Sequence, residues 1–362
     1  MESIMSQVES CVSSSSLPIE QLLEVIGTIS DTNYSRYYLK RFDFDTGIGW
    51  KETRSNILEQ FSGKRKASER ATYSNLVSIT KALMFLGKHY CEIFPLTANE
   101  HSVLVANANK IKYDGKPYSE CFPLFVSPED LTVSSLPVLT HIEYKKSGII
   151  FFFSTPRRVS ERVEKLEKVQ GVLRKVSYRE DIKKQFIDTV FIPKEHNRIE
   201  FKISTEIGKR DIDNEMARLQ DTFVEILSKN GISLKDSNSI NLNKSISTIY
   251  NNSSIGRVVD CVFYSKDNGI SIPRTCRKEV DVCLREQEYH LAGSEKEDVE
   301  CVAVTVRWEE IDPKVKLKIK TQISLESMAN FNYTVCKRFI IDNPKGLSHS
   351  ISLVSIVEKG TE

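Results

Sequence analysis

The sequence predicts an α+β protein with mixed antiparallel sheets, packed helices and a C-terminal part that is mainly β. Three observations predict this class. Apolar residues recur at three- and four-residue steps near 18–30, 68–89 and 211–229, which is typical of amphipathic helices. Apolar and polar residues alternate over much of 257–362, as in strands with one buried face. The chain has no repeated strand–helix–strand pattern that would favour a parallel sheet.

Length and composition indicate a globular chain of several units. The 362 residues are 40% hydrophobic and 28% charged, which suits a protein with a sizeable core. No apolar run approaches the roughly 20 residues of a spanning helix, and residues 1–35 lack the Lys or Arg of a secretory signal. We therefore expect a cytoplasmic protein that does not bind or cross a membrane. Changes in pattern predict four segments: an N-terminal helical and β domain with a basic-aromatic segment (1–135), an α+β unit (136–233), a Ser/Asn-rich loop or linker (234–256) and a mainly antiparallel β domain (257–362).

The N-terminal elements are predicted as two helices separated by an extended segment. Ile19, Leu22 and Ile26 share one face of the first helix. The stretch YYLKRFDFDTGIGW that follows is rich in aromatic residues and predicts an extended chain. The second helix fits residues 68–89. From Glu92 to Phe125 the pattern changes to short strands separated by turn residues.

The middle of the chain predicts two hairpins with a helix between them. PVLTHIEY and GIIFFFS form the first hairpin. Thr155 and Pro156 then indicate a helix, because Thr is a good N-cap and Pro suits the first helical position. Val159 and Val163 mark its buried stripe, and Glu–Lys pairs four residues apart mark its exposed face. IDTVFIPKEHNRIEFKIS, residues 187–204, forms the second hairpin.

The C-terminal third is predicted to be β after a long loop rich in Ser and Asn. RVVDCVFYS, VECVAVTVRWEE, KVKLKIKTQIS and SISLVSIVE each alternate with period two. Residues 311–314, Ile-Asp-Pro-Lys, fit a hairpin turn between the second and third of these strands. Residues 278–291 are compatible with a helix.

One set of residues resembles half of a metal-dependent nuclease site. Such sites need carboxylates that converge on a cation and a Lys that orients the attacking water. Asp188 on one strand, with Glu200 and Lys202 on the next, fits this requirement. The alternative is a structural hairpin in which Ile199 and Phe201 face the core while Glu200 and Lys202 face water. We expect the structural hairpin, because a second, equivalent Glu-x-Lys triplet ends at Lys145 and the pattern is therefore weak.

Other catalytic and metal signatures are missing from the sequence. The eight cysteines include no C-x-x-C pair, so a zinc site is not expected and the thiols are predicted to be buried apolar groups. The chain contains no phosphate-binding glycine loop and no nucleophile elbow. We expect no cofactor, and Mg²⁺ only if the nuclease alternative holds.

Charge is distributed unevenly, and two basic blocks are candidate phosphate-binding surfaces. Residues 36–88 carry a net charge of +6 and residues 144–185 a net charge of +7. Interleaved cations and aromatic rings suit nucleic acid, because cations hold phosphates and rings stack on bases. A helix N-terminus also attracts anions. The candidate nucleic-acid-binding residues are Arg36, Lys40, Arg41, Trp50, Lys51, Arg54, Lys64, Arg65, Lys66, Arg157, Arg158 and Arg162.

These observations favour a non-enzymatic interaction protein that binds nucleic acid through the two basic blocks and has a protein partner or forms a homo-oligomer. The Ser-, Asn-, Ile- and Lys-rich texture resembles that of proteins from bacterial mobile or defence islands, which implies a bacterial, antiviral assembly. The alternatives are the nuclease that uses Asp188, Glu200 and Lys202, and a scaffold that contacts only protein. Binding to nucleic acid would weaken with salt, which separates the first class from the scaffold.

Overall fold

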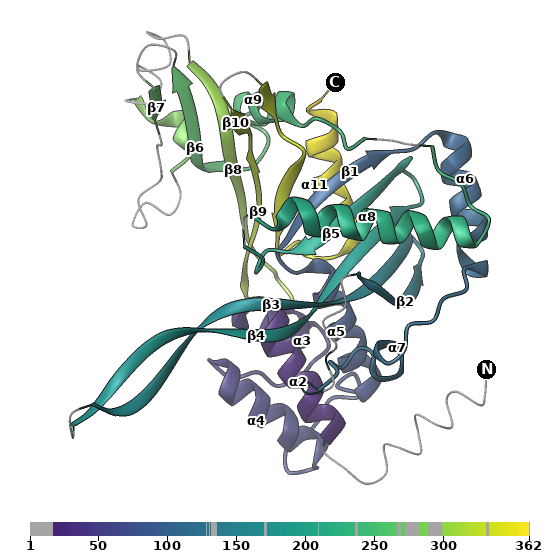
Figure 1. Cartoon of the computed structure of the whole chain (residues 1–362). Helices are drawn as coiled ribbons and strands as arrows, with labels where there is room; N and C mark the ends of the chain where they lie inside the picture. Colours follow the sequence, from purple (N-terminus) through teal and green to yellow (C-terminus); the bar gives the residue numbers. More distant parts are fainter. Residues whose placement is uncertain are drawn as a thin grey trace. The chain divides into compact units, whose positions relative to one another are not determined.

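The computed structural model divides the chain into two compact units (Figure 1). Unit 1 comprises Met1–Ile93 and Asn238–Glu362, and unit 2 comprises Phe94–Ser237. These limits differ from the four predicted segments, because the N-terminal helices belong to the same unit as the C-terminal sheet. The α+β class with a C-terminal β portion is confirmed. The structure describes residues 17–127, 129, 131, 136–169, 172–208, 210–235, 238–265, 269–271, 282–288, 299–330 and 333–361.

Unit 1 begins with helices that pack on one another. They are α2 (Leu17–Ile29), α3 (Thr32–Arg41), α4 (Trp50–Phe61) and α5 (Tyr73–Leu86). The first helix buries Leu22 and Ile26 as predicted. The extended interpretation of the aromatic segment is wrong. Asp31 caps α3 by accepting hydrogen bonds from the backbone N–H groups of Asn33 and Tyr34, and the tyrosines at three- and four-residue spacing form its buried face.

The sheet of unit 1 is antiparallel, with the order β1-β12-β9-β8-β6-β7. Its strands are β1 (His89–Pro95), β6 (Arg257–Ser265), β7 (Gly269–Ser271), β8 (Val299–Ile311), β9 (Lys318–Glu326) and β12 (Arg338–Asp342). Shorter elements are η2 (Leu284–Glu286), β10 (Met328–Asn330) and β11 (Tyr333–Val335). The predicted turn at 311–314 is confirmed, because Asp312 and Leu317 close it with a backbone hydrogen bond.

Two helices complete the core of this sheet, and both correct a prediction. The helix α9 (Asn243–Asn251) lies in the predicted loop 234–256, and α11 (Leu347–Lys359) replaces the predicted strand SISLVSIVE. Leu353, Val354 and Val357 are buried together with Ile246. Val357 follows Leu353 and Val354 by four and three residues, a spacing that fits a helix better than a strand, and it decides the conformation of a segment that also alternates. The predicted helix at 278–291 lies largely outside the described residues.

Unit 2 contains four antiparallel strands in the order β2-β3-β4-β5. Its elements are α6 (Ala98–Asn107), η1 (Ala108–Lys110), α7 (Tyr118–Cys121), β2 (Val138–Lys145), β3 (Gly148–Val169), β4 (Val172–Pro193), β5 (Arg198–Ser204) and α8 (Ile212–Lys229). The short strands predicted from Glu92 to Phe125 are therefore mostly wrong, because Thr97 and Glu100 form a capping box that starts α6. The helix predicted at 211–229 is confirmed as α8.

The helix α8 covers one face of the unit 2 sheet. The Phe223 ring meets the rings of Phe151, Phe153 and Phe201 at centroid distances of 5.1, 6.4 and 5.8 Å. All four rings are buried. Edge-to-face aromatic contacts add to the free energy of burial, so this cluster fixes the strands against the helix.

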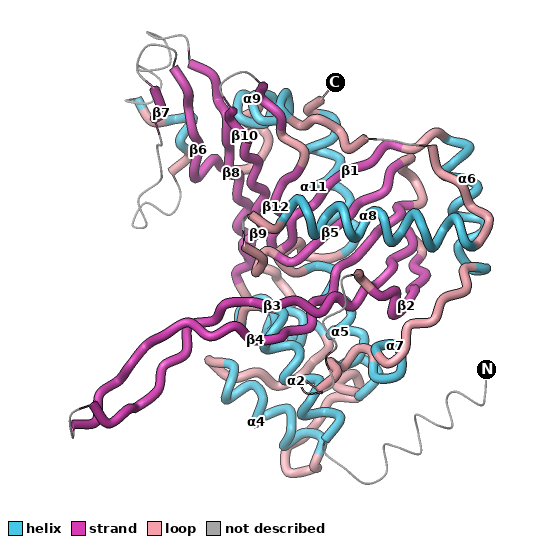
Figure 2. Tube along the Cα trace, in the orientation of Figure 1, coloured by secondary structure: helices cyan, strands magenta, loops and turns pink. Residues whose placement is uncertain are grey.

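A long two-stranded ribbon leaves this sheet, as Figure 2 shows in magenta. Strands β3 and β4 pair over their full 22 residues. Pairing with β2 ends at Ser154 and pairing with β5 ends at Thr189. Residues 155–169 and 172–186 therefore pair only with each other among the described residues. At about 3.3 Å per residue this ribbon is roughly 45 Å long.

The ribbon replaces the helix predicted after Thr155 and Pro156. Val159 and Val163 are four residues apart, and this spacing places two side chains on one face of a helix or of a strand. The predicted Glu–Lys pairs within a helix are instead pairs across the ribbon, such as Glu164 with Lys175 at 2.5 Å. The β-branched residues favour the strand.

Phe201→Ala should lower the free energy of unfolding by about 3–5 kcal/mol, because it leaves a cavity in the aromatic cluster. Urea denaturation checks this value. Leu166→Ala is the matched control, since Leu166 is 72% exposed on the ribbon and its truncation should change stability by less than about 0.5 kcal/mol. Equal stability of both variants would contradict the assigned packing.

Candidate functional site

The hairpin at 187–204 is present, but both faces of β5 are buried. Ile199 and Phe201 are buried as predicted. The expectation that Glu200 and Lys202 face water is wrong, because both are fully buried. The Glu200 carboxylate forms ion pairs with Arg198 at 3.0 Å and with Lys202 at 3.3 Å. The Glu200 carboxylate offsets part of the charge of the two cations, which lowers the cost of burying them on the face that alternation assigned to solvent.

The structure does not bring the three nuclease residues together. Thr189 lies opposite Lys202, and Phe191 lies opposite Glu200. Asp188 is next to Thr189 along β4, so its side chain points to the other face of the sheet. Within the described part of the chain, no group of three His, Cys, Asp or Glu residues is arranged to hold a metal ion. The second triplet, Glu143-Tyr144-Lys145, would need Asp130 as its further carboxylate, and Asp130 lies outside the described residues.

The described thiols have the character of core side chains. Five of the six described cysteines are buried, as predicted. Burial raises the pKa of Cys301 to about 12 and that of Cys336 to about 11. At neutral pH these groups stay protonated, and a protonated thiol is a poor nucleophile.

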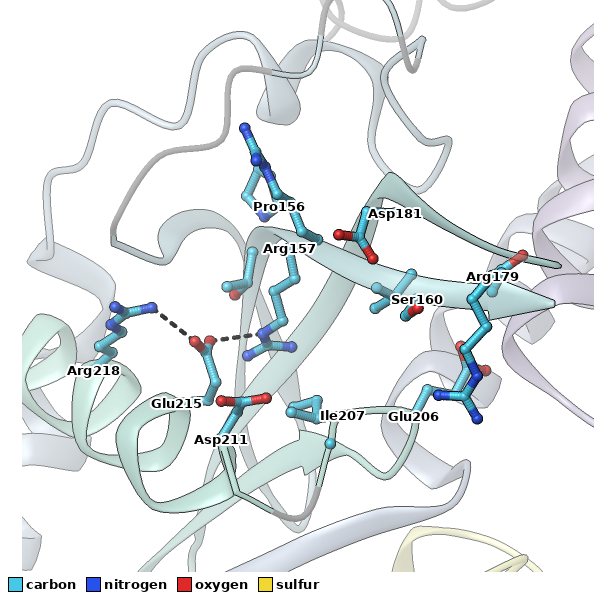
Figure 3. A pocket seen from close by; sticks show the side chains of 15 residues that line it. Pro156, Arg157, Ser160, Arg179, Asp181, Glu206, Ile207, Asp211, Glu215 and Arg218 are labelled. Carbon is cyan, nitrogen blue, oxygen red and sulfur yellow. Dashed lines mark hydrogen bonds and ion pairs between the residues drawn. The ribbon is translucent and has the colours of Figure 1, made fainter. Parts of the chain in front are cut away.

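Arg157, predicted as a phosphate ligand at a helix N-terminus, is instead buried in an ion-pair network. Its guanidinium donates to Asp188 at 2.5 Å and to Glu215 at 2.7 Å. Arg218 donates to the other oxygen of Glu215 at 2.7 Å (Figure 3), and Thr155 donates to Asp188 at 2.6 Å. Burial alone would lower the pKa of Arg157, but the two carboxylates hold it above its ordinary value. The network joins β3, β4 and α8 at the base of the ribbon.

The two faces of the ribbon differ in charge. On one face Arg158 lies opposite Lys183, and Arg162 lies opposite Arg179 four residues further along β3. All four side chains are exposed. Like charges directly opposite each other destabilise an antiparallel pair. Among the described residues none of these four cations forms an ion pair with a carboxylate, so the repulsion is not relieved within the described part of the chain. We call these four residues the cationic face.

The opposite face of the ribbon carries an acidic pair and an apolar row. Glu161 lies opposite Glu180. The half-buried apolar residues are Val159, Val163, Val176, Tyr178 and Ile182. Lys165, Arg174 and Lys184 lie on this face too, but its acidic pair repels phosphate, so the cationic face suits an anionic ligand better.

A groove of about 980 Å³ lies at the base of the ribbon. Residues of both ribbon faces line it, together with residues of the segment before α8 and of α8 itself (Figure 3). Its charged lining residues are four arginines and five carboxylates: Arg157, Arg158, Arg179, Arg218, Glu161, Asp181, Glu206, Asp211 and Glu215. The groove is therefore of mixed charge and does not continue the cationic face.

The first basic block, residues 36–88, belongs to unit 1. The aromatic residues between positions 36 and 66 pack mainly in its core. Tyr37 and Tyr38 are buried in α3. Trp50 is half-buried, and its ring lies so close to Gly27 of α2 that a Cβ there would approach it to 2.3 Å. These rings are therefore poor stacking surfaces for bases.

The cations of this block are spread over several elements. Arg41 donates to the Tyr37 hydroxyl and to the Lys345 carbonyl, both at 3.1 Å, and Arg65 pairs with Asp45 and Glu59. The remaining cations lie on three segments: Arg36 and Lys40 on α3, Lys51 and Arg54 on α4, and Lys64 and Lys66 in the turn after α4. They form no paired rows like those of the ribbon.

Sequence reasoning found Arg158 and Arg162 but missed Arg179 and Lys183. The missing step was the register of the ribbon, which sets each cation opposite another. The Gln-Gly dipeptide at 170–171 is the sequence signal of a hairpin turn, although it lies outside the described residues.

Unit 1 carries a separate group of cations around one carboxylate. Glu309 pairs with Lys318, with Arg257 at 3.3 Å, and with Arg307 and Lys320 at 3.8 Å. Burial would raise the pKa of Glu309, but Lys318 and the other cations lower it below its ordinary value. This glutamate holds four cations of one sheet face together.

Glu200→Gln should lower the free energy of unfolding by on the order of 3–5 kcal/mol, because it leaves Arg198 and Lys202 buried with their shared carboxylate removed. The control is Glu164→Gln, which removes an exposed ion pair with Lys175 worth less than about 1 kcal/mol. Thermal and urea denaturation compare the two. A stable Glu200→Gln variant would restore the solvent-facing interpretation.

Glu309→Gln should destabilise the protein near neutral pH by about 1–2 kcal/mol, since its cations are partly exposed. The pKa of a glutamate is near 4.5 in the unfolded chain and lower in the folded chain. The stabilisation is therefore present above that value and is lost as pH falls through the folded pKa. Urea midpoints from pH 7 to pH 3 should converge for wild type and variant. A constant difference would contradict the assignment.

In the described part of the chain no helix is long and apolar enough to cross a membrane. The comparisons with known proteins provide no relative: no family model matches the chain, and neither a curated protein nor a solved structure matches it. The function must therefore be argued from the site itself.

Proposed function

We propose that the chain binds nucleic acid through the cationic face of the β3–β4 ribbon. The observation that carries this proposal is the pair of rows in which Arg158 faces Lys183 and Arg162 faces Arg179. A phosphate between two such cations replaces their repulsion with attraction. Most protein–nucleic acid hydrogen bonds go to the sugar-phosphate backbone, and Arg and Lys supply many of them.

The charge of the whole ribbon supports the same function. Residues 155–186 include ten Lys or Arg and five Asp or Glu, and the acidic pair Glu161–Glu180 lies on the other face. An extended basic element that is accessible along its length suits a long polyanion better than a small anion. The activity is binding without catalysis. That the chain belongs to a larger bacterial, antiviral assembly is a prediction from the sequence alone.

Binding of a protein partner is supported by a different observation, the apolar row on the opposite face of the ribbon. Val163 and Tyr178 lie opposite each other there and are half-buried. A protein partner could cover this row while the cationic face binds nucleic acid, so the two activities are compatible.

The double variant Arg162→Gln/Arg179→Gln should weaken binding to a short DNA about tenfold or more at 50 mM salt. The slope of log K against the logarithm of the salt concentration should also become less negative by about 1–2, because fewer counterions are released. Fluorescence anisotropy over a salt series measures both quantities.

The matched control is Lys165→Gln/Arg174→Gln, which removes the same charge on the opposite face, closer to the end of the ribbon. Its affinity should stay within about twofold of wild type. Equal loss in both variants, or no binding by the wild type at low salt, would contradict the proposal.

A further inference from the structure

The geometry of the ribbon points to one class of nucleic acid: we infer that it binds B-form DNA duplex by lying in the major groove. This inference rests on the proposed function and names its ligand. The main observation behind it is that both strands contribute to the cationic face, with Arg158 and Arg162 on β3 and Arg179 and Lys183 on β4.

The width of the ribbon matches that groove. Paired strands lie about 4.8 Å apart, and residues 155–169 and 172–186 pair only with each other among the described residues. The major groove of B-DNA is about 12 Å wide and admits a two-stranded β-ribbon. The major groove of duplex RNA is deep and narrow, and side chains cannot read it. The ribbon therefore suits duplex DNA and not duplex RNA.

Two tracks of cations suit two phosphate backbones. A ribbon that lies along the groove has one DNA backbone on each side. The β3 cations Arg158 and Arg162 then face one backbone, and the β4 cations Arg179 and Lys183 face the other. Successive rows are four residues, or about 13 Å, apart, which is close to four base-pair steps of 3.4 Å.

Single-stranded nucleic acid fits this face less well. Proteins that bind single strands combine a basic groove with aromatic rings on which bases stack. The aromatic residue described on the ribbon's free length before Phe186 is Tyr178, and it lies on the opposite face, where the Lys165 ammonium is 5.2 Å from its ring centroid. The cationic face offers hydrogen-bonding groups instead, because Ser160 and Asp181 lie between its two rows. In the major groove Asp accepts a hydrogen bond from the cytosine amino group.

The twist of the ribbon also suits a helical groove. Two-stranded ribbons twist more strongly than wide sheets, and β3 and β4 visibly coil about each other in Figure 1. A flat ribbon would leave the groove after a few base pairs, whereas a coiled one can follow its turn.

The test compares duplex DNA, single-stranded DNA and duplex RNA of one length and sequence, by anisotropy at 50 mM salt with the chain of 362 residues. Duplex DNA should bind at least tenfold more tightly than either other probe, and Arg162→Gln/Arg179→Gln should lose this preference while Lys165→Gln/Arg174→Gln keeps it. Equal or tighter binding of single-stranded DNA or duplex RNA overturns the inference but leaves the proposed function intact. No binding of any probe overturns both.

Dimethyl sulfate footprinting identifies the groove. This reagent methylates guanine N7 in the major groove and adenine N3 in the minor groove, where these atoms are accessible. Wild-type protein should protect guanine N7 on bound duplex, and Lys165→Gln/Arg174→Gln should give the same footprint. Protection of adenine N3 with guanine N7 unprotected, or protection of neither atom on a duplex that is bound, would overturn the assignment to the major groove.

Discussion

The buried Arg157 guanidinium joins the three elements on which the ribbon depends. It lies between Asp188 of β4 and Glu215 of α8, and it belongs itself to β3. Removal of one partner from a buried ion pair costs several kcal/mol, because an uncompensated charge stays behind. The ion pairs form where the sheet gives way to the ribbon, so they hold both strands at the point where they leave the sheet.

The charged residues of unit 2 are of two kinds: some are buried in ion pairs, and others are exposed to a ligand. Glu200 is buried in ion pairs with Arg198 and Lys202, so these three residues belong to the packing of β5 and are inaccessible to a ligand. The exposed cations of the ribbon, such as Arg162 and Arg179, lie opposite each other and raise the energy of the ligand-free ribbon. Exposure and lack of compensation together distinguish a candidate binding surface from a structural ion pair.

The sequence predicted much of the fold and only part of the site, for a common physical reason. Strict alternation identified the hairpin at 187–204, and apolar spacing identified α8. A four-residue repeat fits both a helix and a strand, so the ribbon was predicted as a helix. The ion-pair partners of Glu200 are only two residues away, but its burial depends on what covers that face of β5 in the folded protein. The partners of Arg158 and Arg162 depend on strand register. Neither the covering of a sheet face nor strand register is local in the sequence.

The ribbon also has two edges whose backbone groups pair with no further strand in the described part of the chain, over residues 155–169 and 172–186. Such edges can template the addition of strands from other molecules, and charged side chains are a common protection against this. The high density of Lys, Arg and Glu along the ribbon would keep copies of the chain apart in solution. The charges that attract a polyanion would therefore also suppress self-assembly into extended sheets, and a ligand that neutralised them without covering the edges would promote aggregation.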